Sequence, residues 1–169
     1  MATASTVSSA PTESSLANRA AHAYATIANL IDGLQPLFAL ALRIYVGRVF
    51  FMSGLIKLSS WSSTVALFAN EYHVPVLPPY LAAIMGTAAE IGLPVLLVLG
   101  LGTRFTAFAM FVFNIVAAMS YPDLSPAGLK DHMLWGALLM VTFFYGPGKI
   151  ALDQWLRQRF AQPPDVARR

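Results

Sequence analysis

RIYVGRVFFMSGLIK, residues 43–57, is apolar enough to enter a membrane and yet carries three cations, Arg43, Arg48 and Lys57. At about 100° per residue in an α-helix, Arg43 and Lys57 share one face with two glycines, whereas Arg48 points well away from it. A charge inside hydrocarbon costs about 2.5–3.5 kcal/mol even on lenient insertion scales, so such a side chain usually faces a partner or a water-filled cavity. The stretch therefore predicts a membrane-spanning helix with a polar partner.

The expected partner is Glu90, the one acid in a comparably apolar run. We expect this first helix to contact the helix that carries Glu90, with Arg43 or Arg48 balancing its charge. Counted inward from the outer helix ends, Arg48 lies at the depth of Glu90, and Arg43 lies about 7 Å nearer the cytoplasm. Two interpretations stay open: a mid-membrane pocket that binds a quinone headgroup or conducts protons, and a buried ion pair that only fixes helix register. Asn114 fits either of them.

The composition is that of a membrane protein. Of the 169 residues, 57% are hydrophobic and only 11% are charged, whereas soluble domains carry about 25% charged residues. Four runs approach the roughly 20 apolar residues that span hydrocarbon. We therefore predict an all-α, polytopic membrane protein with a bundle of four transmembrane helices.

Composition also excludes several classes of site. The chain has no cysteine, which excludes disulfides, thiolate metal sites and iron–sulfur ligation within it. The net charge of +3 comes from cations at the expected membrane edges, so we predict no nucleic-acid partner.

Along the chain we expect four segments. Residues 1–15 are small and polar and are expected to be disordered. Residues 16–34 predict an amphipathic helix at the membrane interface that ends near Asp32, although the segment also reads as a lead-in to the first spanning helix. Residues 35–148 hold the four spanning helices, and residues 149–169 form an amphipathic basic tail. The expected spans are about 36–58, 80–100, 104–121 and 130–145.

The distribution of Lys and Arg predicts the orientation. Seven cations lie near one set of helix ends, against Lys57 and Lys130 near the other. The positive-inside rule then places both termini in the cytoplasm. The seven are Arg19, Arg104, Lys149, Arg157, Arg159, Arg168 and Arg169.

A second polar group is expected at the outer face. Its histidines are far apart in sequence and form no His-x₃-His pair, so we predict no metal site. Binding of a divalent ion and acceptance of a proton from a quinol stay open beside the simpler reading of hydrated interface groups. The members are Lys57, Glu71, Tyr72, His73, Tyr121, Asp123, Lys130, Asp131 and His132.

Three stretches in this order carry a family resemblance: LRIYVGRVFFMSGLIKL, AAEIGLPVLLVLGLGTRFTA and GPGKIALDQWL. The sequence resembles the DoxX family of small four-helix membrane proteins over about residues 38–156. The resemblance implies a bacterial inner-membrane protein linked to quinone oxidoreductases. Many members have a histidine before the glycine that matches Gly54, but here that residue is Ser53, which argues against a haem or proton-relay role.

At the cytoplasmic rim we expect one further contact. Asp153 follows the fourth spanning helix on the side where Arg104 begins the third. We predict that the two approach each other and tie the rim together, against the alternative of two solvated charges.

The favoured function is an accessory membrane component of a redox system, with a quinone as the candidate cofactor in a pocket near Arg43, Glu90 and Asn114. A second hypothesis is a non-catalytic membrane anchor or assembly factor for a soluble oxidoreductase. A third is a small transporter or metal-handling protein that uses the outer polar group. Candidate partners are the lipid bilayer, a redox partner protein and further copies of the chain.

Overall fold

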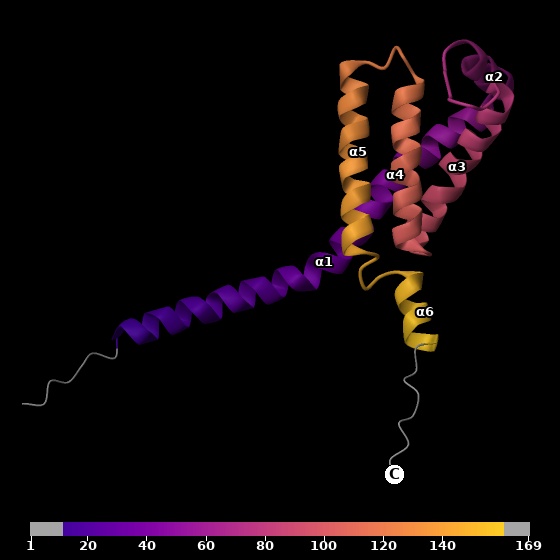
Figure 1. The fold of residues 1–169 in the computed structure, drawn as a ribbon. Helices are drawn as coiled ribbons and strands as arrows, with labels where there is room; N and C mark the ends of the chain where they lie inside the picture. The colour runs from indigo at the N-terminus through magenta and orange to yellow at the C-terminus, as the bar shows by residue number, and fades with distance from the viewer. Residues whose placement is uncertain (1–11, 161–169) are drawn as a thin grey trace, which may run out of the picture. The chain divides into compact units, whose positions relative to one another are not determined.

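The computed structural model describes residues 12–160, with side chains from residue 17, and this range contains six helices and no strand (Figure 1). The helices are α1 (Thr12–Ser59), α2 (Trp61–Asn70), α3 (Pro79–Leu99), α4 (Thr103–Ser120), α5 (Pro126–Tyr145) and α6 (Leu152–Phe160). Residues 12–15, expected to be disordered, are helical, because extending a helix from an alanine-rich segment costs little once it has formed. The rest of that expected tail, residues 1–11, lies outside the described range, as do residues 161–169 of the basic tail.

The predicted helix break near Asp32 is wrong. The chain divides into two units between Gln35 and Pro36, yet α1 continues through this division as one helix of 48 residues. Pro36 lies inside this helix, and a proline is tolerated within a membrane-spanning helix because neighbouring groups satisfy the backbone carbonyl that it frees. Whether residues 16–34 lie at a membrane surface stays a prediction.

Three of the described helices are long and apolar enough to cross a membrane: α1 over Ala17–Ser59, α3 and α4. This agrees with a helical membrane protein. The fourth expected span, α5, is 20 residues long but is not among them. Its first two turns contain Lys130, Asp131 and His132, which lower its mean hydropathy.

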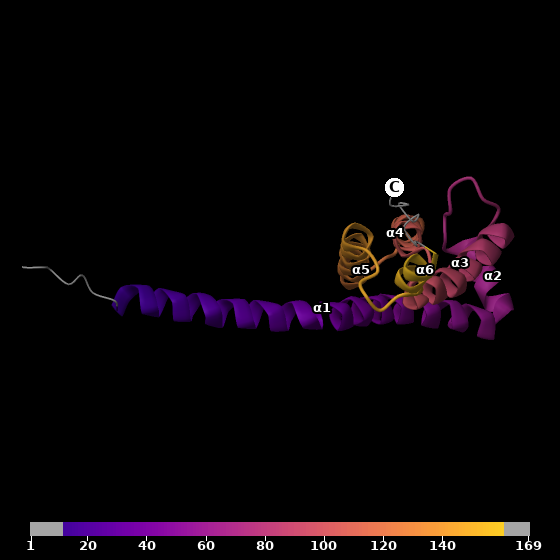
Figure 2. The same ribbon diagram turned by 90° about the horizontal axis from the view of Figure 1, so that it is seen from below.

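Within residues 36–160, α4 and α5 run antiparallel and side by side, and α3 lies along α4 (Figures 1 and 2). Their shared core is built from Val46 and Phe50 of α1, Leu97 of α3, Met110 of α4 and Leu139 of α5, all buried. The ring of Phe50 lies edge-on to that of Trp135, with centroids 5.7 Å apart.

The predicted contact between α1 and the helix of Glu90 is confirmed, and two glycines make it close. A Cβ at Gly47 would lie 2.8 Å from Val98 Cγ2. One at Gly54 would lie 3.1 Å from Glu90 Cβ and 2.7 Å from Ile91 Cγ1. A side chain at either position would force its neighbours to move, so the two glycines allow the helices to pack closely here.

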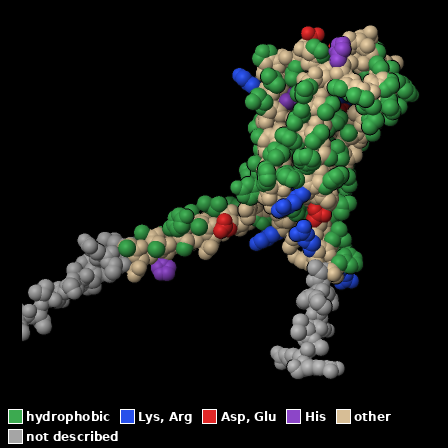
Figure 3. All heavy atoms as spheres, in the orientation of Figure 1, with side chains coloured by type: hydrophobic (Ala, Val, Ile, Leu, Met, Phe, Trp, Pro, Cys, Tyr) green, Lys and Arg blue, Asp and Glu red, His purple; other side chains and the backbone are tan. Residues whose placement is uncertain are grey.

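The two ends of residues 36–160 differ in character. We call the end where α3 stops, α4 begins and α6 lies the basic end, since Arg104, Lys149, Arg157 and Arg159 are there. We call the opposite end, formed by α2 and the loops 71–78 and 121–125, the loop end. Figure 3 shows Lys and Arg atoms gathered near α6, and hydrophobic side chains covering the sides of the bundle.

Candidate functional site

A buried ion pair joins α1 to α3 towards the loop end. Lys57 Nζ donates to both carboxylate oxygens of Glu90, at 2.8 and 2.7 Å. It also donates to Ser53 Oγ at 2.9 Å, and that hydroxyl donates to Glu90 Oε1 at 3.2 Å. The side chains of Lys57 and Glu90 are only 11% and 9% exposed. The expected pairing of Glu90 with Arg43 or Arg48 is therefore wrong.

The register of α3 against α1 explains this difference. The first turns of α3 extend beyond the end of α1 and pack against α2, where a Cβ at Gly86 would lie 3.3 Å from the ring of Phe68. The predicted depth of Glu90 was counted from the helix ends and did not include this offset. Glu90 consequently lies level with Gly54, one turn from Lys57, rather than level with Arg48.

Arg43 acts at the basic end, where it binds backbone carbonyls. It is 1% exposed. Its guanidinium donates to the carbonyl oxygens of Leu97 and Val98, both at 3.4 Å, of Ala39 at 3.3 Å, and of Ile150. The last carbonyls of a helix lack intrahelical donors and carry negative partial charge. Arg43 therefore caps the C-terminus of α3 and ties it to the segment before α6.

Asp153 caps the N-terminus of α4 from another part of the chain. Its carboxylate accepts from the backbone amide of Gly102 at 2.8 Å, and from the amide and hydroxyl of Thr103 at 2.7 and 2.8 Å. Burial alone would raise the pKa of Asp153, but these hydrogen bonds and nearby Arg157 outweigh it and hold that pKa below its usual value. The predicted contact with the Arg104 side chain is wrong, since that guanidinium lies beside Gly146.

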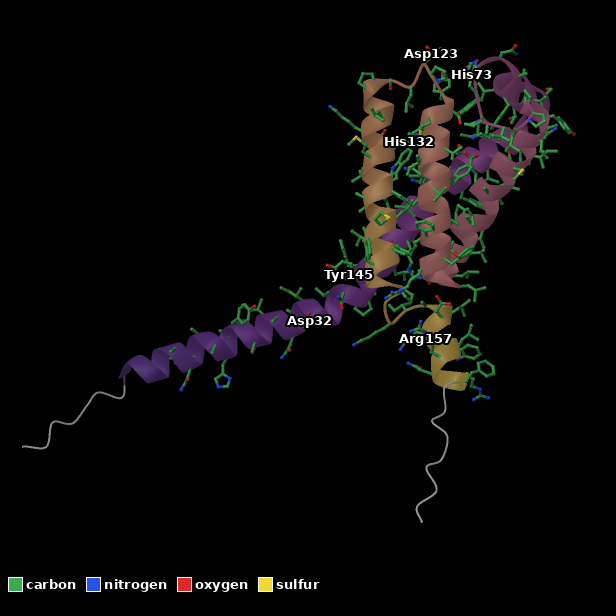
Figure 4. All side chains as sticks on the ribbon, in the orientation of Figure 1. Asp32, His73, Asp123, His132, Tyr145 and Arg157 are labelled. Carbon is green, nitrogen blue, oxygen red and sulfur yellow. The ribbon has the colours of Figure 1, made fainter. Side chains whose placement is uncertain are left out.

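Asn114 pairs with His132 between α4 and α5. Its amide nitrogen donates to the carbonyl oxygen of His132 at 2.9 Å, and its amide oxygen lies 2.8 Å from His132 Nδ1. Because the amide oxygen only accepts, this geometry places a proton on Nδ1. Figure 4 shows His132 on the side of α5 that faces the other helices. Asn114 therefore joins neither Arg43 nor Glu90.

The other predicted site residues do not gather at one place. Arg48 is exposed on a different face of α1, and Glu71, His73 and Asp131 are exposed towards the loop end. Within the described range, no three His, Asp or Glu side chains gather closely enough to hold a metal ion. Of the expected outer group, Lys57, Tyr72, Tyr121 and His132 line a common cavity.

Two cavities meet at the ion pair. One, of about 210 Å³, is enclosed mostly by apolar side chains of α2, α3 and α4. The other, of about 180 Å³, extends towards Tyr121, His132 and Trp135. The cavities share four lining residues: Lys57, Tyr72, Glu90 and Ala117. The pair thus lies in the wall between an apolar space and a more polar one.

Two buried hydroxyls have no partner in the described part of the chain, and one of them faces this site. Ser120 is 1% exposed, its Oγ makes no hydrogen bond, and it lines the apolar cavity. The other is Thr87, on α3. A buried hydroxyl without a partner costs about 1–3 kcal/mol, so Ser120 is a donor left available to a molecule in that cavity.

Tyr72 was expected in the outer polar group, but not beside Glu90. It lines both cavities and also a third space of about 410 Å³ beneath the loop at residues 73–79. Its ring stacks on Phe68 at 4.8 Å and lies 5.2 Å from that of Tyr121. Burial, with a smaller contribution from the charge of Glu90, raises the pKa of its hydroxyl, which stays protonated.

No site role was predicted from the sequence for Ser53 or Ser120. Ser53 lies four residues before Lys57 and so on the same helical face, a spacing that could have revealed it. No comparable signal exists for Ser120 in its apolar run.

Comparison with known proteins gives one match. The sequence model of the DoxX family matches residues 38–122, just over half of the chain. The matched range contains the ion pair, Ser53, Tyr72 and Ser120, whereas His132 and Asp153 lie beyond it. No curated protein and no solved structure matches the chain.

Proposed function

The chain is a membrane protein of the DoxX family, and on that premise we propose that it serves a membrane redox system by holding a quinone headgroup beside Lys57 and Glu90. The observation that carries this proposal is the combination of an apolar cavity, a buried ion pair in its wall and the unpartnered hydroxyl of Ser120. Pockets for small molecules are mostly apolar, with a few polar groups that fix orientation.

The polar groups of the cavity divide into two roles. All three N–H donors of Lys57 are already used, two on Glu90 and one on Ser53. The hydroxyl of Ser120 has no such partner and is the donor available to a quinone carbonyl. The ammonium of Lys57 then acts through its field, which favours the negative charge that a quinone oxygen gains on reduction.

Membrane topology forms part of the proposal. α5 packs along α4 and is bound to it through Asn114 and His132. If α4 crosses the bilayer, α5 crosses beside it, as the fourth span. Under the positive-inside rule, the cations of the basic end support a cytoplasmic location for that end and for both termini, and the family resemblance favours the inner membrane of a bacterium. A soluble redox partner would then bind at the basic end.

Quenching of Trp135 fluorescence tests the pocket, because Trp135 lines the cavity next to the ion pair. We expect a short-tailed benzoquinone, added to the whole protein in mild detergent, to quench this fluorescence saturably. Trp135→Phe removes the signal and so identifies its source. Ala117→Phe fills the wall shared by both cavities and is expected to weaken binding at least about tenfold.

The matched control is Ala109→Phe, the same change on the same helix at a half-buried position outside all these cavities. Equal binding by the two variants would overturn the pocket. Recovery of a stoichiometric soluble enzyme with no quinone, after extraction from native membranes, would favour the anchor hypothesis instead.

A further inference from the structure

Arg48 is a charged side chain for which the protein supplies no counter-charge. It is exposed on α1, inside a helix apolar enough to span a membrane. Over residues 17–160 it takes part in no side-chain hydrogen bond and no ion pair, since the one ion pair there joins Lys57 to Glu90. A cation in this position needs a partner from outside the chain.

An apolar groove begins beside this cation. It has a volume of about 300 Å³ and lies between α1 and α3. Gly47 and Pro94 form its narrow floor, where the two helices are in backbone contact, and Arg48 is its only charged lining residue. The side chains along it are Ile44, Phe51, Val95, Val98 and Leu99.

The depth of Arg48 places it close to the basic end. The neighbouring Gly47 contacts Val98 and the carbonyl oxygen of Pro94, and α3 ends at Leu99. Arg48 therefore lies about one helical turn, near 5 Å, from the end of α3. An arginine side chain can extend over that distance towards the headgroup region. The headgroup of a lipid in that leaflet would lie within its reach.

We propose that this groove binds one anionic glycerophospholipid, with its phosphate on Arg48 and an acyl chain lying between α1 and α3. The charge complementarity is direct, because guanidinium binds phosphate through two parallel hydrogen bonds. The groove supplies the matching apolar surface for the chain. This site is independent of the quinone pocket, which lies at the other end of the α1–α3 contact and shares no lining residue with it.

Native mass spectrometry of the whole protein in mild detergent tests the site. The probes are phosphatidylglycerol and phosphatidylcholine with identical acyl chains, added at equal concentration. We expect one phosphatidylglycerol to be retained in preference to phosphatidylcholine. Arg48→Gln is expected to reduce its retention about fivefold, the ratio expected for one basic residue acting on an anionic lipid. Arg159→Gln, an exposed cation of the same end outside the groove, should leave retention unchanged.

A second pair of variants tests the groove itself without changing charge. Val95→Trp fills it, whereas Val112→Trp adds the same bulk on α4, and the two valines are 43% and 44% exposed. Only Val95→Trp should lower retention. Equal retention by wild type and Arg48→Gln, or by the two tryptophan variants, would overturn the proposal. A dimer that forms without lipid and is lost in Val95→Trp would assign the groove to a second copy and overturn it as well.

Discussion

The two ends of the bundle use buried polar groups differently. At the basic end, Arg43 and Asp153 bind the backbone, one at the last carbonyls of α3 and the other at the first amides of α4. Towards the loop end, Lys57 and Glu90 bind each other in a cavity wall, and the hydroxyl of Ser120 has no partner in the described structure. The first set completes helix termini, while the second includes a hydroxyl whose hydrogen-bonding capacity is unused. Burial alone therefore does not identify a functional residue.

The largest expected effect is at the basic end. Arg43→Met would leave the carbonyls of Val98 and Ile150 without the guanidinium donor, and that of Leu97 with only the amide of Gly100, so we expect stability to fall by roughly 3–5 kcal/mol. The measurement is thermal unfolding in detergent. Arg48→Met, the same change at an exposed position, should have little effect. Similar losses in the two variants would remove the structural role assigned to Arg43.

The next effect concerns the ion pair. Glu90→Gln leaves the Lys57 ammonium buried without its counter-charge and should cost about 2–3 kcal/mol. Adding Lys57→Met should recover part of that loss, giving a coupling of about 1–3 kcal/mol in a double-mutant cycle. The losses of stability caused by Glu90→Gln and by Arg43→Met should add in the double variant. A coupling free energy between Glu90 and Arg43 in that second cycle would contradict our conclusion that the two ends act independently.

A smaller effect, with a pH signature, is expected at Asp153. Asp153→Ala removes the cap of α4 and should cost about 1–2 kcal/mol at pH 7. Because the folded-state pKa is lowered, the carboxylate stabilises the protein fully above its ordinary pKa of 3.8, and this contribution is lost as pH falls through the lower folded value. Unfolding measured from pH 7 to pH 3 should show the difference between wild type and variant shrinking with acid. A constant difference would rule out the carboxylate as its source.

The smallest effect on stability should be at Ser120. Its hydroxyl has no partner to lose, so Ser120→Ala should not lower stability, and removing the unsatisfied group should raise it by about 1 kcal/mol. The same variant should weaken benzoquinone binding about fivefold, through loss of one hydrogen bond. Thr87→Val, which removes the other unpartnered hydroxyl, serves as the control. A clear loss of stability in Ser120→Ala would place this residue with the structural groups.

The sequence predicted the helices and one contact well, for physical reasons that lie in the residues themselves. Pro79 marks the start of α3, Gly100 follows its last residue, and Gly146 follows the last residue of α5. The contact between α1 and α3 was predictable because Glu90 needed a cation and Gly54 allowed a close approach. The continuity of α1 through Pro36 was not predictable, since a proline inside a helix and one at its start look alike in sequence.

The site was less predictable. The partner of Glu90 depends on the offset of α3 against α1, which is set by α2 packing on the first turns of α3. The partners of Arg43 are backbone carbonyls, which every residue has and no sequence pattern marks. Ser120 is distinguished by a buried hydroxyl without a partner, a property that exists only in three dimensions.

The shared position of Tyr72 has a kinetic consequence. One aromatic ring forms part of the wall of all three spaces, from the loop at residues 73–79 to the ion pair, and it is held by stacking on Phe68. Under the proposed function, a molecule that enters from the loop side would have to pass this ring, so we expect the ring to set the rates of binding and release on that route. We expect affinity to be set by Ser120 and the ion pair instead. Residence time and affinity would then depend on different residues.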